Sequence, residues 1–518
     1  MCIDQKSIDG WFKEAAGSQA ISVDAISIER LSNISMSGSF VYRSSVQRRD
    51  DVTLFLLQID GHNVLVLSVS APTDLPEEFD GISRIHGKVR MKFCPLTHQN
   101  AAALRGFLPY TAPAPLSKKA STFGVGDRLG IAGPGHIRLF KSFKASPVLA
   151  QQSVREVELT GRTFEDVLDA STWAVFQEGY KEAWGADGDH LKTEQWVRKA
   201  VTIGFTMITA DVSDYIRSEL TAAPVDTVLE NYETIDPHYR ERVESFYLDK
   251  KWELDCNLLI RFTKEDLARA VVVYREAVDH AKRLYEAALE ANGEGSFDFE
   301  LSVDETPAPT TPQAHIFVAQ ELKTQGVVIW SVAPRFVGEF QKGIDYIGDV
   351  EDFEKTFRIY AAIARIFGHK VSVHSGSDKF SIFPAVGRLS CGEFHVKTSG
   401  TNWLLALKVI AQKDRALFLR LYRFALDHFD KARTYYHVTP NLKNVPDPSQ
   451  LENHDLIPLF NNPDSRQVLH ITYGEMFTDN SLKEDIFKTL EQHIEHYYKQ
   501  LQDHIGDHLR LLGVETEG

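Results

Sequence analysis

Cysteine is scarce in this chain of 518 residues, and the few cysteines stand far apart. There are four of them, Cys2, Cys94, Cys256 and Cys391, and no two form a CxxC pair. A disulfide framework needs many cysteines in a short chain, and a thiolate zinc site needs closely spaced pairs. We therefore expect neither.

Long apolar runs and an excess of positive charge are also missing. No run of 18 apolar residues occurs, and the polar start MCIDQKSIDGWFKEAAG has no hydrophobic region typical of a secretory signal. The net charge of -15 argues against a nucleic-acid or anionic-membrane surface. We expect a cytoplasmic protein that acts on a small molecule, with no nucleic-acid or membrane partner. A homo-oligomer is compatible with this sequence.

The length and composition are those of a globular enzyme with more than one core. Hydrophobic residues make up 43% and charged residues 25% of the chain. A single hydrophobic core rarely serves 518 residues, so one large domain with additions, or two domains, is expected.

The N-terminal part has the pattern of a β-rich subdomain. In DVTLFLLQIDGHNVLVLSV, residues 52–70, two apolar runs flank Asp60-Gly61, which predicts a hairpin because glycine accepts a positive φ. The Pro/Ala-rich stretch TAPAPLSKKAS follows at 111–121. We place a mainly β subdomain at residues 1–115.

Beyond that stretch, short apolar runs alternate with amphipathic helical patterns. The runs lie at 122–126, 147–152, 204–211, 297–303, 326–332 and 369–376. Such alternation predicts parallel βαβ units, and their number predicts an α/β fold with a (β/α)8 TIM-like barrel over residues 116–480. Residues 481–518 read as one long helix packed outside the barrel.

A glycine-rich segment after the first barrel strand does not indicate a nucleotide site. GVGDRLGIAGPGH, residues 124–136, is spaced GxGxxxG, and no acidic residue follows at the expected distance. There is no GKT or GKS, which excludes a P-loop. The glycines allow a tight turn that places Asp127 and Arg128 at the barrel mouth.

Two strands carry polar side chains that a barrel would turn inward. In FDFELSV the alternation puts Asp298, Glu300 and Ser302 on one face. A carboxylate inside a barrel is costly unless it is paired, bound to a metal or used in catalysis, so Glu300 is either functional or part of a buried ion pair. In KVSVHSGSDKFS, His374 stands at the carboxyl end of its strand, where barrel enzymes keep their sites.

Two histidines at strand ends, His190 and His374, favour a metal site. Imidazole suits zinc, manganese, nickel, cobalt or iron, and a catalytic site needs about three protein ligands. A third ligand has three candidates, Glu339, Gln341 and Asp345.

The segments beside these candidates supply further polar residues. Arg335, Lys342 and Lys397 are candidate cations for a substrate carboxylate. His395, Lys397 and His470 lie in two other segments, and each is individually a weak candidate. The histidines of the C-terminal segment (His493, His496, His504, His508) fall on an expected solvated face and do not indicate a metal site.

Four long motifs resemble a known family. GADGDHLKT, VAPRFVGEFQKGIDYIGD, VSVHSGSDKF and FHVKTSGTNW are similar to segments of the tagaturonate/fructuronate epimerases of bacterial hexuronate breakdown. The likeness runs from about residue 120 to about 480. The Asp-His-Leu element also resembles that of class II tagatose-bisphosphate aldolases.

The resemblance implies a divalent metal and inversion at C4 of a ketohexuronate, with the tagatose/fructose pair as a related activity. It implies that Asp189 and Glu300 are acid/bases, and that His190 and His374 are metal ligands. It puts the third ligand at or next to Gln341. Ser153 is implied to face the substrate, and Lys192 is placed to bind its carboxylate or a hydroxyl.

Two other functions remain open at this point. A class II aldolase would use the same metal and aspartate, but would release three-carbon products. A non-catalytic barrel subunit would bind no metal, and the joint presence of Asp189, His190, Glu300 and His374 speaks against it.

Overall fold

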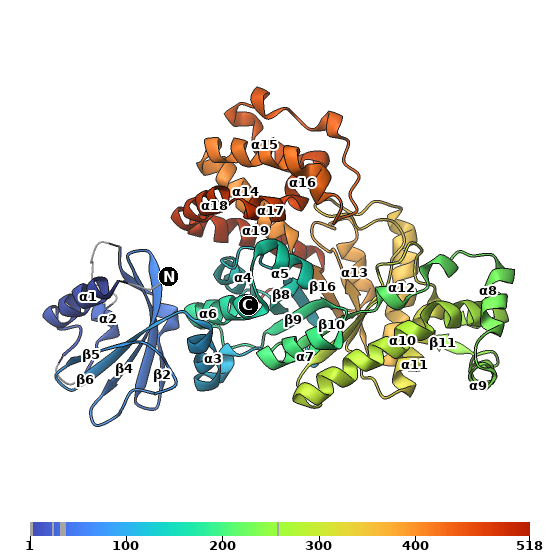
Figure 1. Cartoon of the computed structure of the whole chain (residues 1–518), viewed down its shortest axis with the longest axis horizontal. Helices are drawn as coiled ribbons and strands as arrows, with labels where there is room; N and C mark the ends of the chain where they lie inside the picture. The colour runs from blue at the N-terminus through green and yellow to red at the C-terminus, as the bar shows by residue number, and fades with distance from the viewer. Residues whose placement is uncertain (1–3, 23–24, 32–37, 256–257, 518) are drawn as a thin grey trace. The chain divides into compact units, whose positions relative to one another are not determined.

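The computed structural model describes residues 4–22, 25–31, 38–255 and 258–517 in two compact units (Figure 1). Unit 1 comprises residues 1–113 and 165–183, and unit 2 comprises residues 114–164 and 184–518. Unit 1 therefore takes in a segment from beyond the expected N-terminal subdomain.

Unit 1 is built on an antiparallel sheet in the order β1-β3-β4-β6-β5, with β2 paired to β3. The expected hairpin is formed by β3 and β4, and its turn residues Asp60 and Gly61 have φ of 49° and 78°. The strands are β1 (Phe40–Val41), β2 (Gln47–Arg49), β3 (Val52–Ile59), β4 (His62–Ser70), β5 (Ile82–His86) and β6 (Val89–Pro95).

Both faces of this sheet are covered, which explains why β3 is apolar at successive positions. Phe55 and Leu57 belong to one buried cluster, together with Trp11 of helix α1 (Gln5–Gly17). Leu54 belongs to the other, with residues of α3 (His98–Phe107) and with Trp173 of α6 (Phe164–Glu178). Helix α6 was expected among the barrel helices, but its buried Trp173 and Phe176 pack in the core of unit 1.

Unit 2 contains a closed barrel of eight parallel strands, which confirms the predicted (β/α)8 fold. The strands pair in chain order, and the parallel pairing of β16 with β7 closes the ring. They are β7 (Ser121–Val125), β8 (Ser146–Ser153), β9 (Gly185–Leu191), β10 (Met207–Asp211), β13 (Asp298–Ser302), β14 (Ser331–Ala333), β15 (Lys370–Val373) and β16 (Phe394–Thr398).

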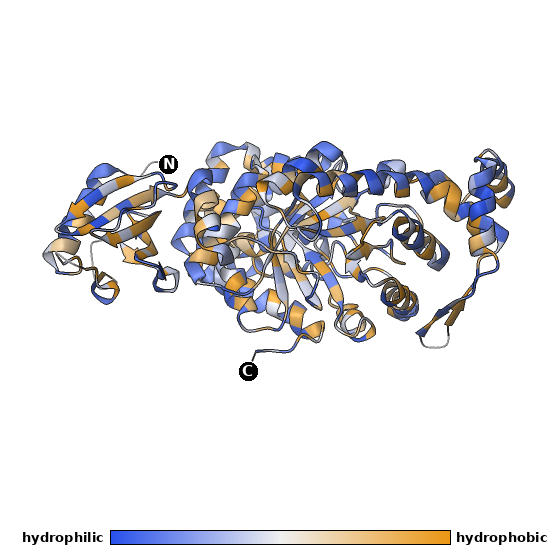
Figure 2. Cartoon of the chain, turned by 90° about the horizontal axis from the view of Figure 1, so that it is seen from below, coloured by the Kyte–Doolittle hydropathy of each residue, from blue (hydrophilic) through white to orange (hydrophobic). Residues whose placement is uncertain are grey.

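Helices follow the barrel strands and surround them (Figure 2). They are α4 (Gly133–Phe140), α5 (Val154–Thr160), α7 (Glu194–Ile203), α10 (Lys264–Asn292), α11 (Pro312–Thr324), α12 (Val350–Phe367), α13 (Phe383–Leu389) and α14 (Gly400–Lys413). Between β10 and α10 the chain inserts α8 (Val225–Glu233), α9 (Pro237–Tyr247) and the two-stranded sheet β11 (Trp252–Leu254) and β12 (Leu258–Ile260).

The C-terminal part is a group of helices, and its last segment is two helices where one was expected. The helices are α15 (Arg415–Ala432), α16 (Pro463–Ile471), α17 (Tyr473–Thr478), α18 (Asn480–Gln492) and α19 (Ile494–Leu511). His493 separates α18 from α19 because its φ of -124° is not helical. Tyr497 of α19 donates a hydrogen bond to the carbonyl of Asn402, so α19 packs against α14.

The sequence also predicted neither a disulfide framework nor a membrane-spanning helix. Cys94 and Cys391 are free thiols, while Cys2 and Cys256 lie outside the described residues. None of the helices within the described ranges is long and apolar enough to cross a membrane.

Candidate active site

A bulge in β9 brings two neighbouring side chains to the same place. Gly188 pairs with Ile208 and Leu191 with Ala210, so Asp189 and His190 stand opposite a single residue of β10. His190 has a φ of 52°, in the left-handed region. Adjacent residues on a regular strand point to opposite faces, and a bulge removes this constraint. Asp189 and His190 therefore both line one cavity.

The cavity has a volume of about 1170 Å³ and lies at the carboxyl ends of the barrel strands. Loops and strand ends from around the barrel line it, including those that carry Asp189, Glu305, His374 and Lys397. This is the end of a (β/α)8 barrel at which active sites are built.

Lys397 of β16 is surrounded by carboxylates in the floor of the cavity. Its Nζ atom lies 2.6 Å from Oδ2 of Asp187, 2.7 Å from Oδ1 of Asp189 and 2.7 Å from Oε1 of Glu300. Thr209 accepts a further hydrogen bond from it. All four charged side chains are buried. Lys397 was expected to bind the substrate carboxylate, but these three partners already take up its positive charge.

The charges in this cluster set its protonation. Burial alone would raise the pKa values of Asp189 and Glu300, but Lys397 and the neighbouring histidines lower both. Burial raises the pKa of Asp187 to about 7, because Lys397 offsets only part of its desolvation. Asp189 and Glu300 are therefore the ionised carboxylates of the cluster.

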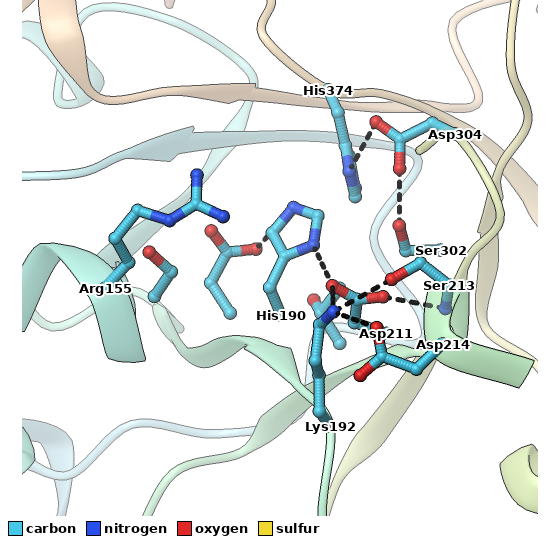
Figure 3. Close-up of polar contacts among 12 residues, drawn as sticks. Arg155, His190, Lys192, Asp211, Ser213, Asp214, Ser302, Asp304 and His374 are labelled. Carbon is cyan, nitrogen blue, oxygen red and sulfur yellow. Dashed lines mark hydrogen bonds and ion pairs between the residues drawn. The ribbon is translucent and has the colours of Figure 1, made fainter. Parts of the chain in front are cut away.

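The rings of His190 and His374 lie next to each other in the site (Figure 3). Their ring centroids lie 5.1 Å apart. Nε2 of His374 lies 2.6 Å from Oε1 of Glu300, and its Nδ1 lies 3.4 Å from Oδ2 of Asp304. Nδ1 of His190 lies 3.2 Å from Oδ2 of Asp211. Each imidazole thus has a carboxylate that fixes its orientation.

The charge balance around these histidines fits a divalent cation. Burial would lower both histidine pKa values, but the nearby carboxylates raise that of His190 to about 10 and that of His374 to about 9. Ligand atoms of His190, Asp211 and Glu305 lie within 4.8 Å of one another. Imidazole and carboxylate ligands together are typical of transition-metal sites.

The side chain of Gln341, placed by the resemblance at or next to the third ligand, is engaged elsewhere. Its Oε1 atom accepts hydrogen bonds from the backbone N–H of Thr439, at 3.0 Å, and from Nε2 of Gln467, at 2.8 Å. Glu339 accepts a hydrogen bond from its amide. Asp345 caps a different loop through the backbone N–H of Ser381.

Two residues expected at the barrel mouth have structural contacts. Asp127 accepts hydrogen bonds from the backbone N–H groups of Leu129, Gly130 and Ala132, which hold the glycine-rich turn. Arg128 is buried and forms an ion pair with Glu156 at 2.8 Å. Its guanidinium also lies 3.8 Å from the ring centre of Tyr473.

Besides Lys397, four of the expected substrate-binding residues line the cavity: Ser153, Lys192, Arg335 and Lys342. Ser153 caps α5 by accepting a hydrogen bond from the backbone N–H of Glu156. Nζ of Lys192 lies 2.8 Å from Oδ1 of Asp214.

Sequence reasoning missed four carboxylates of the site, Asp187, Asp211, Asp304 and Glu305. Asp187 lies two positions before Asp189 on the same strand, so alternation could have placed it in the barrel interior. Asp211 ends β10, and Asp304 follows β13 by two residues. A carboxylate at the carboxyl end of a barrel strand was the available signal.

The histidines of the last helix lie away from this site. Nε2 of His504 lies 2.5 Å from Oδ1 of Asp378, and His508 accepts a hydrogen bond from the Asp378 backbone N–H. Arg466 pairs with the same carboxylate at 2.5 Å. This cluster holds α19 against the loop after β15.

Known proteins are similar to this chain in both sequence and fold. The family described as UxaE, tagaturonate epimerase, matches residues 42–512. A tagaturonate/fructuronate epimerase of Thermotoga maritima is 43% identical over 479 residues, which cover 92% of this chain and 97% of that protein.

Solved structures of the fructuronate-tagaturonate epimerase UxaE from Cohnella laeviribosi superpose on this chain. The native structure has a TM-score of 0.88 at 43% identity and covers 94% of this chain and 99% of that one. A complex with two glycerols has a TM-score of 0.89 at 42% identity, with 96% and 100% covered. The chain therefore belongs to the tagaturonate epimerase family.

Proposed function

We propose that this protein inverts C4 of a ketohexuronate and so interconverts D-tagaturonate and D-fructuronate with the help of a divalent metal. One observation carries the proposal: the buried carboxylates of Asp189 and Glu300, from two different strands, both contact Nζ of Lys397 beside two histidines at the base of the cavity. The kinship with named epimerases supports the same reaction. Tagatose and fructose are a related substrate pair, because only the group at C6 differs.

The metal would be held by His190 and His374, and its identity would be zinc, manganese, nickel, cobalt or iron. The third ligand expected at Gln341 remains a prediction, and Asp304 offers a carboxylate beside His374. When bound, a divalent cation supplies a Lewis acid that stabilises oxyanions of the ketose.

Inversion at C4 poses a chemical problem, because the C2 carbonyl acidifies the hydrogen at C3 and not the one at C4. In one route the carbonyl first moves from C2 to C3 through an enediolate, which makes the C4 hydrogen acidic. In the other, the C3–C4 bond breaks in a retro-aldol step and re-forms on the opposite face. The first route needs two acid/bases that flank C4, and the second does not.

We favour proton transfer because two ionised carboxylates on separate strands, Asp189 and Glu300, lie against Lys397 at the base of the cavity. Asp189 would accept or donate a proton on one face of C4, and Glu300 on the other. Lys397 holds both carboxylates from below, which fixes their separation. The buried setting keeps both groups away from bulk water between the two transfers.

The proposal is tested with the purified, metal-loaded protein, tagaturonate and sugar analysis of the product. Asp189→Asn and Glu300→Gln should each lower kcat by about 10²–10⁴-fold. Glu158→Gln is the matched control, since Glu158 is an exposed carboxylate at the rim of the same cavity. Absence of fructuronate from the wild-type reaction, or accumulation of three-carbon products alone, would refute the epimerase assignment.

A further inference from the structure

One corner of the cavity, opposite in charge to the carboxylate cluster, has the features of an anion site. It lies where the loops after β15 and β16 meet the start of α14. Ser375, Ser399, Gly400, Lys342 and His470 line it. Loops after the seventh and eighth strands of (β/α)8 barrels are a frequent place for binding phosphate.

The N-terminus of α14 opens into this corner. The helix runs for 14 residues, and no side chain caps its first turn with a hydrogen bond. The first backbone N–H groups of a helix have no partner within the helix, and the helix dipole favours an anion there. Ser399, at the cap position, donates its hydroxyl hydrogen bond to Glu156 instead.

His470 is the second and independent sign of a ligand. Its side chain is 1% exposed, and neither ring nitrogen has a hydrogen-bond partner among the described residues. A Cβ atom at Gly400 would lie 1.6 Å from Nε2 of His470, so the ring is seated directly at the start of α14. Buried polar atoms are nearly always satisfied, which indicates that a bound group completes this corner.

The cations around the corner exceed the carboxylates. Arg128 pairs with Glu156, and Arg466 pairs with Asp378. Lys342 forms no ion pair with a described residue, and its Nζ atom donates only to the hydroxyl of Ser375, at 2.9 Å. Lys342 is partly buried, and a bound anion would compensate the cost of desolvating its charge.

We propose that Lys342, His470 and the N-terminus of α14 form an oxyanion subsite that receives the C6 carboxylate of the substrate. This inference rests on the proposed function for the identity of the substrate. The acidic end of the cavity would then hold the metal and the reacting carbons, and the basic end the carboxylate. The substrate would be oriented by two sites of opposite charge.

Among the cations that line the cavity, Lys342 is the one placed to bind the substrate carboxylate. Lys397 and Lys192 are paired with carboxylates. Arg155 donates a hydrogen bond to the carbonyl of Tyr435. Neither Arg155 nor Arg335 belongs to the corner at the N-terminus of α14. Lys342 is thus the cation that selects acidic over neutral ketoses.

The test compares the metal-loaded wild type with Lys342→Met and His470→Leu, using Lys413→Met as the control. Lys413 is an exposed lysine at the opposite end of α14. Lys342→Met should lower kcat/KM for tagaturonate by about 10–100-fold and that for neutral tagatose by less than about threefold. Inorganic sulfate should bind the wild type in calorimetry and compete with tagaturonate, and both variants should weaken its binding at least about tenfold.

Several outcomes overturn the inference. Equal losses on tagaturonate and tagatose would assign Lys342 to the chemistry, and unchanged sulfate binding in both variants would remove the subsite. A higher kcat/KM for tagatose 6-phosphate than for tagaturonate would make the ligand a phosphate and contradict the carboxylate. If the wild type binds sulfate but does not turn over tagaturonate, and both variants lose sulfate binding, the subsite stands and the proposed function fails.

Discussion

The Nζ atom of Lys397 lies 2.7 Å from Oδ1 of Asp189, although 208 positions separate the two residues in the chain. The contact joins the last barrel strand to the third. It places a cation beneath one proposed acid/base, and the same cation also touches Glu300. Lys397 is therefore a positioning residue for both carboxylates.

Replacing Lys397 by methionine should abolish turnover and destabilise the protein. Removal of one partner from a buried ion cluster costs about 3–5 kcal/mol because the remaining charges are left unpaired. We expect kcat with tagaturonate to fall more than about 10³-fold. Lys397→Arg keeps the charge and should recover part of the stability in thermal melts. A methionine variant with more than a tenth of the wild-type kcat would contradict this role.

Loss of either histidine should remove the metal together with activity. His374→Ala and His190→Ala should each lower metal content and kcat in parallel, because each deletes a proposed ligand. Elemental analysis of the purified variants measures the first, and tagaturonate turnover the second. His437→Ala is the control, since its ring lies at the cavity rim and is 76% exposed. Full metal content in His374→Ala would show that His374 is no ligand.

Gln341→Leu separates two roles for this amide. The side chain bonds Thr439 and Gln467, so we expect the variant to loosen residues 435–439 at the cavity rim. KM for tagaturonate should rise while the metal content stays at the wild-type level. Loss of metal from Gln341→Leu would instead make the amide the third ligand.

Turnover in heavy water reports on the route at C4. Proton transfer by Asp189 and Glu300 should place deuterium at C4 of fructuronate formed from tagaturonate, as read by NMR or mass spectrometry. Retro-aldol cleavage needs no exchange at this carbon. An unlabelled C4 after many turnovers would count against the two-carboxylate route.

Lys379 should make the free energy of unfolding depend on pH above neutrality. It is buried, and its Nζ atom donates to the carbonyls of Gln341, Ile344 and Ser377. Burial lowers its pKa to about 7 in the folded state. Between pH 7 and the unfolded value of about 10.4, the unfolded chain binds more protons, so the free energy of unfolding rises with pH.

The measurement is the difference in free energy of unfolding between the wild type and Lys379→Met. This difference should grow in favour of the wild type by about 1.4 kcal/mol per pH unit above pH 7 and stay constant below it. A difference that does not change from pH 7 to pH 9 would mean that Lys379 keeps an ordinary pKa.

The sequence by itself determined the barrel, the hairpin of unit 1 and the family, because these depend on local alternation and on long motifs. The polar face of FDFELSV predicted an inward Glu300, and the strand-end position of His374 predicted a place at the barrel mouth. The adjacent Asp189 and His190 also indicated a bend in the strand, where the structure has a bulge.

Only the tertiary structure decided which charges meet. Lys397 was predicted to bind the substrate carboxylate. Its three carboxylate partners each lie more than 90 residues away from it in the chain. Arg128 became a structural residue because Glu156 and Tyr473 enclose it. The free energy of a charged side chain depends on the partners that folding brings within a few ångströms, and spacing along the chain does not contain that information.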